Sequence, residues 1–239
     1  MPLILNIETA TEVCSVALAK NGSLISIAES NVPRAHASLL TLLIQQVINE
    51  SGKSFSDLDA IAVSKGPGSY TGLRIGVATA KGLCYALNKP LLAINTLQIM
   101  TAFFLKSEFL NPKPQIPKPK ILFIPLLDAR RMEVYAAAFD SDLNFILETK
   151  AEIIKENSFL SLLEKQKIFF FGNGTEKCVP FLKNQPNAEL IPDFKTSSTG
   201  MIQISNEVFS QKKFEDIAYF EPFYLKDFIA VSRQVKAEV

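Results

Sequence analysis

The sequence predicts an α/β fold of two lobes, each built on a β-β-β-α-β-α-β unit. The chain opens with three apolar segments, and Asn21-Gly22 between the second and third is a strong signal for a two-residue hairpin. Helical and strand patterns then alternate, and a shorter, similar series follows a proline-rich stretch. The elements expected in the first lobe are strands at 3–8, 13–20, 23–29, 60–64 and 91–94, and helices at 34–51 and 73–87.

Start and stop signals define the two helices of the first lobe. Pro33 precedes the first helix and Gly52 follows it, while Pro90 blocks continuation of the second. Three antiparallel strands followed by helix, strand, helix and strand is the order of a ribonuclease-H-like half. Actin-like (ASKHA) and sugar-kinase proteins duplicate that half, so the order predicts an actin-like, two-lobed fold.

The second lobe is expected to be a smaller, degenerate version of the first. Residues 111–120 contain four prolines and are expected to form a stiff surface linker. Its lysines are expected to solvate a loop, with a phosphate-binding patch as the alternative. We predict lobes at 1–98 and 99–239, with the last segment able to pack back on the first lobe. The other expected elements are helices at 96–106 and 158–165, and strands at 121–127, 133–139 and 168–171.

The composition indicates that this protein does not bind nucleic acid without a partner protein. The chain has 239 residues, with 25 basic residues against 24 acidic ones and a formal net charge of +1. Proteins that bind nucleic acid by themselves usually carry a basic excess, because phosphate contacts supply most of the affinity. The three cysteines form no C-x-x-C pair, which favours a reduced, cytoplasmic compartment over a disulfide framework or a zinc ribbon. No apolar run is long enough to span a membrane.

The loop at 65–72 is rich in glycine and leads directly into the second helix. Glycine permits close backbone approaches, and the N–H groups at a helix N-terminus attract anions. A phosphate, a nucleotide or a partner's carboxylate could bind there. The alternative is a turn needed only for tight strand-to-helix packing, and the Walker A pattern is absent. The residues of this candidate anion loop are Glu8, Thr9, Gly66, Gly68, Ser69, Thr71, Gly72 and Arg74.

Catalysis by this chain alone is not expected. His36 is its single histidine, and Leu40 stands four residues later, so a two-histidine metal site on one helix face is impossible. No Gly-x-Ser-x-Gly elbow is present. Asp128 and Glu8 could form a carboxylate pair across the cleft, but single carboxylates near strand ends are common.

The two helices of the first lobe instead suggest a protein interface. Apolar residues cover more of the first helix than one core contact requires. The second helix carries two ridges of small residues, Gly72-Gly76-Ala80 and Ala78-Gly82-Ala86. One ridge can rest on the sheet and the other can receive a partner helix; the alternative is that both helices are buried in one compact domain. The predicted contact positions are His36, Leu39, Leu42, Leu43, Gly72, Gly76 and Ala80.

Three ordered motifs and a closing segment resemble the TsaB (YeaZ-type) family. They are Ile-Glu-Thr-Ala-Thr-Glu-Val-Cys-Ser-Val-Ala-Leu at 7–18, Lys-Gly-Pro-Gly-Ser-Tyr-Thr-Gly-Leu-Arg-Ile-Gly at 65–76, Leu-Asp-Ala-Arg-Arg-Met-Glu-Val-Tyr at 127–135 and Glu-Pro-Phe-Tyr-Leu-Lys at 221–226. The match is best over the first hundred residues and weakest over 150–213. One departure is Glu8, where the family often has Asp.

The resemblance implies a non-catalytic subunit of the machinery that makes N6-threonylcarbamoyladenosine (t6A) in tRNA. It implies a TsaD-like catalytic partner and a TsaE-like ATPase. In that family the two helices contact TsaD, and they support a homodimer when TsaD is absent. The resemblance also implies that the chain contacts tRNA only as part of the complex, and that the complex is cytoplasmic. No cofactor is firmly implied by the resemblance, although ATP or ADP could bind at the complex interface.

Two rival functions remain open at the level of sequence. An ATP-dependent kinase or metal-dependent hydrolase of the same fold would need a second phosphate loop, for which Gly172-Asn173-Gly174 is the candidate. A nucleotide-binding regulator would use the loop at 66–74 alone.

Overall fold

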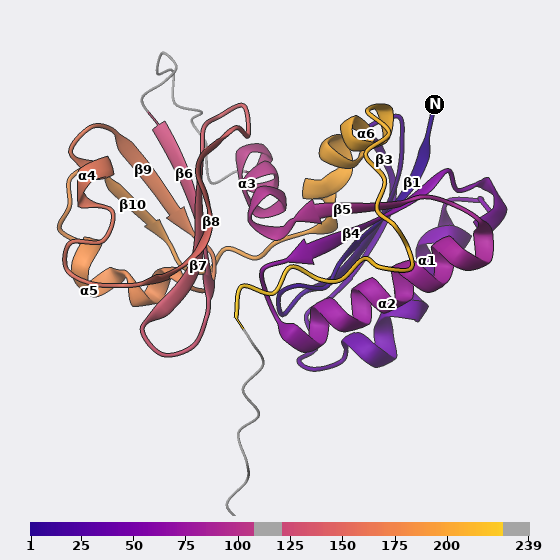
Figure 1. The fold of residues 1–239 in the computed structure, drawn as a ribbon, viewed down its shortest axis with the longest axis horizontal. Helices are drawn as coiled ribbons and strands as arrows, with labels where there is room; N and C mark the ends of the chain where they lie inside the picture. The colour runs from indigo at the N-terminus through magenta and orange to yellow at the C-terminus, as the bar shows by residue number, and fades with distance from the viewer. Residues whose placement is uncertain (108–120, 227–239) are drawn as a thin grey trace, which may run out of the picture.

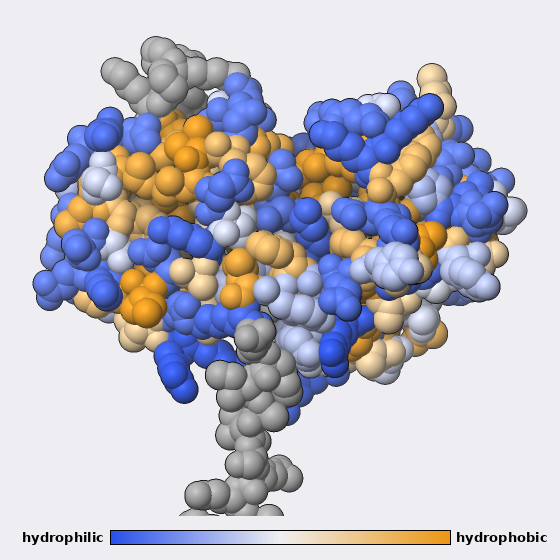
Figure 2. Space-filling view, in the orientation of Figure 1, coloured by the Kyte–Doolittle hydropathy of each residue, from blue (hydrophilic) through white to orange (hydrophobic). Residues whose placement is uncertain are grey.

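The computed structural model describes residues 1–107 and 121–226, which form two lobes lying side by side (Figure 1). Each lobe contains one five-stranded sheet. The proline-rich stretch predicted as a linker, 111–120, lies outside the described residues. Figure 2 shows hydrophobic residues on this face of the second lobe and at the boundary between the lobes, next to hydrophilic ones.

The first sheet has the strand order β3-β2-β1-β4-β5. Strand β1 pairs antiparallel with β2 and parallel with β4, so it occupies the centre of the sheet. All six of its residues are buried, as expected for a strand covered on both faces. The strands are β1 Leu3–Glu8, β2 Cys14–Lys20, β3 Ser23–Ser30, β4 Ala60–Gly66 and β5 Leu91–Asn95.

The second sheet repeats the same order, because β8-β7-β6-β9-β10 matches β3-β2-β1-β4-β5 position by position. Strand β6 pairs antiparallel with β7 and parallel with β9, as β1 does with β2 and β4. The predicted duplication of a ribonuclease-H-like unit is therefore confirmed. The strands are β6 Ile121–Asp128, β7 Glu133–Phe139, β8 Phe145–Ile153, β9 Lys167–Phe171 and β10 Ala188–Ile191.

Helices cover both faces of the first sheet. Helices α1 and α2 lie in contact on one face, where they share a core with β1, β2 and β4 (Figure 1). Helix α3 and the segment formed by η4 and α6 cover the opposite face. The helices are α1 His36–Glu50, η1 Phe55–Asp57, α2 Tyr70–Leu87, α3 Thr96–Lys106, α4 Leu160–Leu163, η3 Thr175–Lys177, α5 Val179–Leu182, η4 Ser198–Met201 and α6 Ile202–Ser210.

Several predicted boundaries differ from the structure. Helix α2 begins at Tyr70, earlier than the predicted start at 73, because the side chain of Ser69 accepts a hydrogen bond from Gly72 N–H and caps the helix. The helix predicted at 158–165 is only the single turn α4, since Phe159 adopts a left-handed φ of 64° before it. Strands β8 and β10 and helix α6 were not predicted.

Helix α3 packs against both lobes. Ile99 and Ala102 belong to the core under the first sheet, whereas Met100 and Phe104 belong to a phenylalanine-rich core under the second. The ring of Phe104 stacks on Phe171 with centroids 4.2 Å apart. The predicted lobe boundary between residues 98 and 99 stays a prediction.

The last described residues return to the first lobe. Met201 and Ile204 pack on the first sheet with Ile4. Residues 215–226, which we call the C-terminal strap, then run along α2 toward the second lobe (Figure 1). The strap ends where Lys226 pairs with Glu133 of β7.

Candidate functional site

The glycine loop packs directly on the turn between β1 and β2. A Cβ atom on Gly68 would lie 2.3 Å from the carbonyl oxygen of Ala10, and one on Gly72 would lie 2.1 Å from that of Thr9. The N–H group of Ser69 donates a hydrogen bond of 2.7 Å to Ala10 O. The loop therefore needs glycine at these positions to make this close contact. The space beside the glycines is filled by the turn and does not form a phosphate-binding pocket.

The polar groups of the same loop are also engaged within the chain. Ser69 Oγ lies 3.2 Å from Gly72 N, and the guanidinium of Arg74 lies 4.4 Å from the ring centroid of Tyr70. A hydrogen bond to Tyr224 raises the pKa of Arg74. A Cβ on Gly66 would lie 2.7 Å from Phe223 O in the strap, whereas Thr71 is exposed. The packing alternative accounts for the glycines, and anion binding at this loop stays a prediction.

Glu8 is a completely buried carboxyl group at the end of β1. Its Oε1 accepts a hydrogen bond of 2.6 Å from Ala10 N, and Oε2 has no partner among the described residues. Burial raises the pKa of Glu8 to about 7, against the lowering effect of the hydrogen bonds. The neighbouring Thr9 is also buried, and its hydroxyl has no partner within the described part of the chain.

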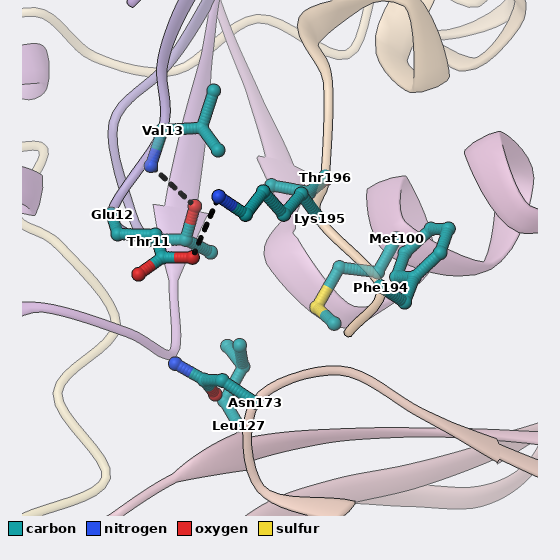
Figure 3. Close-up of a pocket in the computed structure, with 9 residues that line it drawn as sticks. All are labelled: Thr11, Glu12, Val13, Met100, Leu127, Asn173, Phe194, Lys195 and Thr196. Carbon is teal, nitrogen blue, oxygen red and sulfur yellow. Dashed lines mark hydrogen bonds and ion pairs between the residues drawn. The ribbon is translucent and has the colours of Figure 1, made fainter. Parts of the chain in front are cut away.

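The crevice beside this turn is small, and Figure 3 shows the side chains that surround it. It is lined by residues of both lobes and has a volume of about 10 Å³, roughly the space for one water molecule. Lys195 reaches across toward Glu12 at 3.8 Å. This crevice has no room for a nucleotide as it stands. The lining residues are Thr11, Glu12, Val13, Met100, Leu127, Asn173, Phe194, Lys195 and Thr196.

The second candidate phosphate loop, residues 172–174, also packs closely against the chain. Gly172 has a φ of 105°, and a Cβ there would lie 2.5 Å from Leu126 O. Asn173 Oδ1 accepts a hydrogen bond of 2.9 Å from Asp128 N. Asp128 is exposed and pairs with Lys177 at 2.7 Å, whereas Glu8 is enclosed, so the two carboxylates do not form the pair considered from sequence.

The small-residue ridges of α2 lie on different sides of the helix, about 120° apart. A Cβ on Gly76 would lie 2.1 Å from Thr9 Oγ1, and Ala80 is fully buried in the core. The other ridge, Ala78-Gly82-Ala86, is exposed, and a Cβ on Gly82 would meet no atom of residues 1–107 or 121–226 within 4 Å. The prediction that Gly72, Gly76 and Ala80 contact a partner is therefore wrong, because that ridge faces the sheet.

The predicted contact positions on α1 also divide into buried and exposed residues. His36 and Leu43 are buried, with Leu43 in the core beneath the helix, so their assignment to a partner surface is wrong. Leu39 is half-buried. Leu42 is 62% exposed and is the predicted position that a partner could cover. It lies about half a turn away from Leu40 and Ile44, which face the core.

Sequence reasoning missed the contacts of the C-terminal strap. Lys81 Nζ donates hydrogen bonds to Phe220 O at 2.9 Å and Ala218 O at 3.3 Å. The ring of Tyr224 lies 4.8 Å from that of Tyr70. The motif at 221–226 identified this segment as part of the family resemblance. No local sequence pattern, however, indicates which helix an irregular segment packs against.

Comparisons with known proteins agree with this architecture. A family model described as "TsaD: tRNA N6-adenosine threonylcarbamoyltransferase" matches residues 27–230. The protein named tRNA threonylcarbamoyladenosine biosynthesis protein TsaB from Escherichia coli (strain K12) is 30% identical, over 95% of this chain and 96% of its own length. The chain is a TsaB-type member of this family. The resemblance found in the sequence motifs is thereby confirmed.

Other TsaB relatives and a solved structure extend the match. TsaB from Haemophilus influenzae is 27% identical over 94% of this chain and 93% of its own length. The structure titled "YeaZ from Pseudomonas aeruginosa" superposes with a TM-score of 0.78 at 24% identity, covering 94% of this chain and 100% of that one, which supports the fold. The tRNA N6-adenosine threonylcarbamoyltransferase of Zymomonas mobilis is 38% identical, but only over 41% of this chain and 31% of its own length.

Within the described residues, none of the helices of this TsaB-type chain combines the length and apolar character that a bilayer crossing requires.

Proposed function

We propose that this chain is a non-catalytic subunit of the t6A-forming machinery and docks a TsaD-like catalytic subunit through the outer faces of α1 and α2. The names of its TsaB relatives support a role in threonylcarbamoyladenosine biosynthesis. The TsaD-type family model supports a catalytic partner with a related fold.

The observation that carries this proposal is Gly82. Glycine inside a helix costs roughly 0.5–1 kcal/mol relative to alanine. Gly66 and Gly76 are needed for close contacts within the chain, but a Cβ on Gly82 would point into open space. A helix from another molecule that approaches closely along Ala78-Gly82-Ala86 explains why this position lacks a side chain. Leu42, on the adjacent α1, adds an exposed apolar contact.

The catalytic role is assigned to the partner because residues 1–107 and 121–226 show no cluster of nucleophilic, acid–base or metal-ligating side chains. Its only histidine, His36, is buried, and the three cysteine thiols are buried as well. Burial raises the pKa of Cys14 to about 11 and of Cys84 to about 12, so these thiols stay protonated and are weak nucleophiles.

Docking is tested by replacing Gly82 with leucine in the full chain. Gly82→Leu is expected to lower co-purification with a TsaD-like subunit at least about tenfold, since a buried clash at an interface costs more than 1.4 kcal/mol. Its thermal stability should be at or slightly above the wild-type level, because the position is open and leucine favours a helix more than glycine does. Lys53→Leu, on the exposed loop after α1, serves as the matched surface control and should bind normally. Unchanged binding of Gly82→Leu would reject this surface.

Catalysis is tested in a reconstituted t6A assay from which single components are omitted. We expect no modified nucleoside when the TsaD-like subunit is left out, even with excess of this chain. Product formed without that subunit would show that this chain is itself the enzyme. ATP turnover by the purified chain alone would instead support the kinase or hydrolase rival.

The remaining partners follow from the same proposal. In the absence of the TsaD-like subunit, the outer faces of α1 and α2 are expected to pair in a homodimer. A TsaE-like ATPase and tRNA are expected to join only in the complex, in the cytoplasm. No cofactor is firmly implied for this chain alone; ATP or ADP could bind at the complex interface, because the crevice beside the glycine loop is nearly filled.

A further inference from the structure

A second, larger cleft lies between the lobes on the side of the C-terminal strap. Its volume is about 810 Å³, within the range typical of small-molecule sites. One wall is formed by β5 and the start of α3, the facing wall by β8, and the third by α6 and the strap (Figure 1). Neither the glycine loop beyond Lys65 nor the exposed ridge of α2 lines it.

Hydrogen bonds hold these walls in place. Asn95 Nδ2 donates a bond of 3.0 Å to Thr149 Oγ1, which links β5 to β8 across the lobe boundary. In the strap, Glu215 N donates to Leu91 O at 3.0 Å and Phe223 N donates to Lys65 O at 2.7 Å. Contacts within the chain therefore fix the relative positions of the walls.

The charged residues that line the cleft are predominantly acidic. Three glutamates, Glu148, Glu215 and Glu221, face a single lysine, Lys65. Glu221 interacts electrostatically with Arg74. In contrast, Glu148 and Glu215 form no ion pair with any residue in 1–107 or 121–226. Two carboxylates without an ion-pair partner, placed on two walls of one cleft, attract a cation more strongly together than either would alone.

The rest of the lining is apolar and aromatic. Phe145 of β8 and Phe220 of the strap contribute rings, and Ile204 and Val208 of α6 contribute aliphatic side chains. Aromatic faces attract ammonium groups, and aliphatic stems gain from covering apolar surface. A ligand that complements these walls carries a positive charge on a hydrocarbon chain.

We propose that this cleft binds aliphatic ammonium ligands, either a free polyamine or lysine side chains of a peptide, with Glu148 and Glu215 as the anionic contacts. The positive charge of Lys65 repels such a ligand, so removing that charge should strengthen binding. This binding is independent of the docking surface on α1 and α2.

The experiment is calorimetric titration of the full chain at physiological salt, with spermidine in one arm and trilysine in the other. We expect saturable binding of at least one probe. The double variant Glu148→Gln/Glu215→Gln should weaken it about tenfold or more, because both anionic contacts are lost. Glu207→Gln, an exposed glutamate of α6 outside the lining, is the matched control and should bind as wild type.

Lys65→Met should tighten binding, and a merely unfolded protein could not produce this result. Melting curves of every variant confirm that the fold is intact; if the double variant is unfolded, Glu148→Gln alone, at an exposed position, replaces it. Binding of spermidine alone identifies a polyamine site, and binding of trilysine alone identifies a docking site for a basic peptide. Absence of saturable binding in both arms, or binding that the glutamate variants leave unchanged, overturns the proposal.

Discussion

A methyl group on Gly76 would lie 2.1 Å from the hydroxyl oxygen of Thr9. This contact joins the middle of α2 to the turn after β1, and it decides which side of α2 is internal. Six residues later, Gly82 has no neighbour within 4 Å of the same position. The two helical glycines therefore have opposite roles, and each yields a prediction.

Gly76→Ala should destabilise the chain. The new methyl group collides with a fully buried threonine, and relief requires a shift of α2 or of the turn at Thr9. Overpacking of this kind costs about 1–3 kcal/mol in the free energy of unfolding. Denaturation in urea measures the loss, and a variant as stable as wild type would contradict the packing described for this ridge.

Gly82→Ala should stabilise the isolated chain by about 0.5–1 kcal/mol, because alanine loses less backbone entropy in a helix than glycine. The position is open, so no clash offsets the gain. The same urea series measures it. A loss of stability would show that Gly82 has a structural role inside the chain.

Glu8 should make stability fall as pH rises from about 4.5 to about 7. In the folded chain its pKa is raised from 4.5 to about 7 by burial, so the folded state keeps a proton that the unfolded state releases. The contribution is complete below pH 4.5, is lost as pH rises through 7, and amounts to about 3 kcal/mol. Glu8→Gln should remove this dependence.

The measurement for Glu8 is the free energy of unfolding of wild type and Glu8→Gln at several values of pH. The difference between the two proteins should change across this window. Glu164→Gln, an exposed glutamate, should follow the wild-type curve. Parallel curves for wild type and Glu8→Gln would show that Glu8 is ionised in the folded chain throughout.

Tyr224→Ala should loosen the C-terminal strap while leaving the sheets intact. The substitution removes a ring that lies 4.8 Å from Tyr70 and the hydrogen-bond partner of Arg74. An aromatic pair contributes about 0.5–1.5 kcal/mol, so amide exchange at 217–223 should accelerate about fivefold. Exchange in β1 should not change. Tyr219→Ala, at a residue that is 85% exposed, is the control and should leave strap exchange as in wild type.

Much of the fold could be predicted from the sequence because its signals are local. The Asn21-Gly22 turn, the helix with Pro33 before it and Gly52 after it, and the apolar strands all depend on neighbouring residues. The elements that escaped prediction have weaker local patterns. Strand β8, for example, alternates poorly between buried and exposed residues because it lies at a sheet edge beside the cleft.

The sequence by itself determined the α/β element order of the first lobe, the family resemblance and the presence of two small-residue ridges on one helix. Only the tertiary structure decided which ridge is internal, because both repeat every four residues and differ only in what the rest of the chain places against them. Thr9 and Ala10 fill the space over Gly72, Gly76 and Gly68, whereas nothing reaches Gly82. The fold thus packs the glycine loop against the turn after β1 and leaves the ridge Ala78-Gly82-Ala86 of α2 exposed.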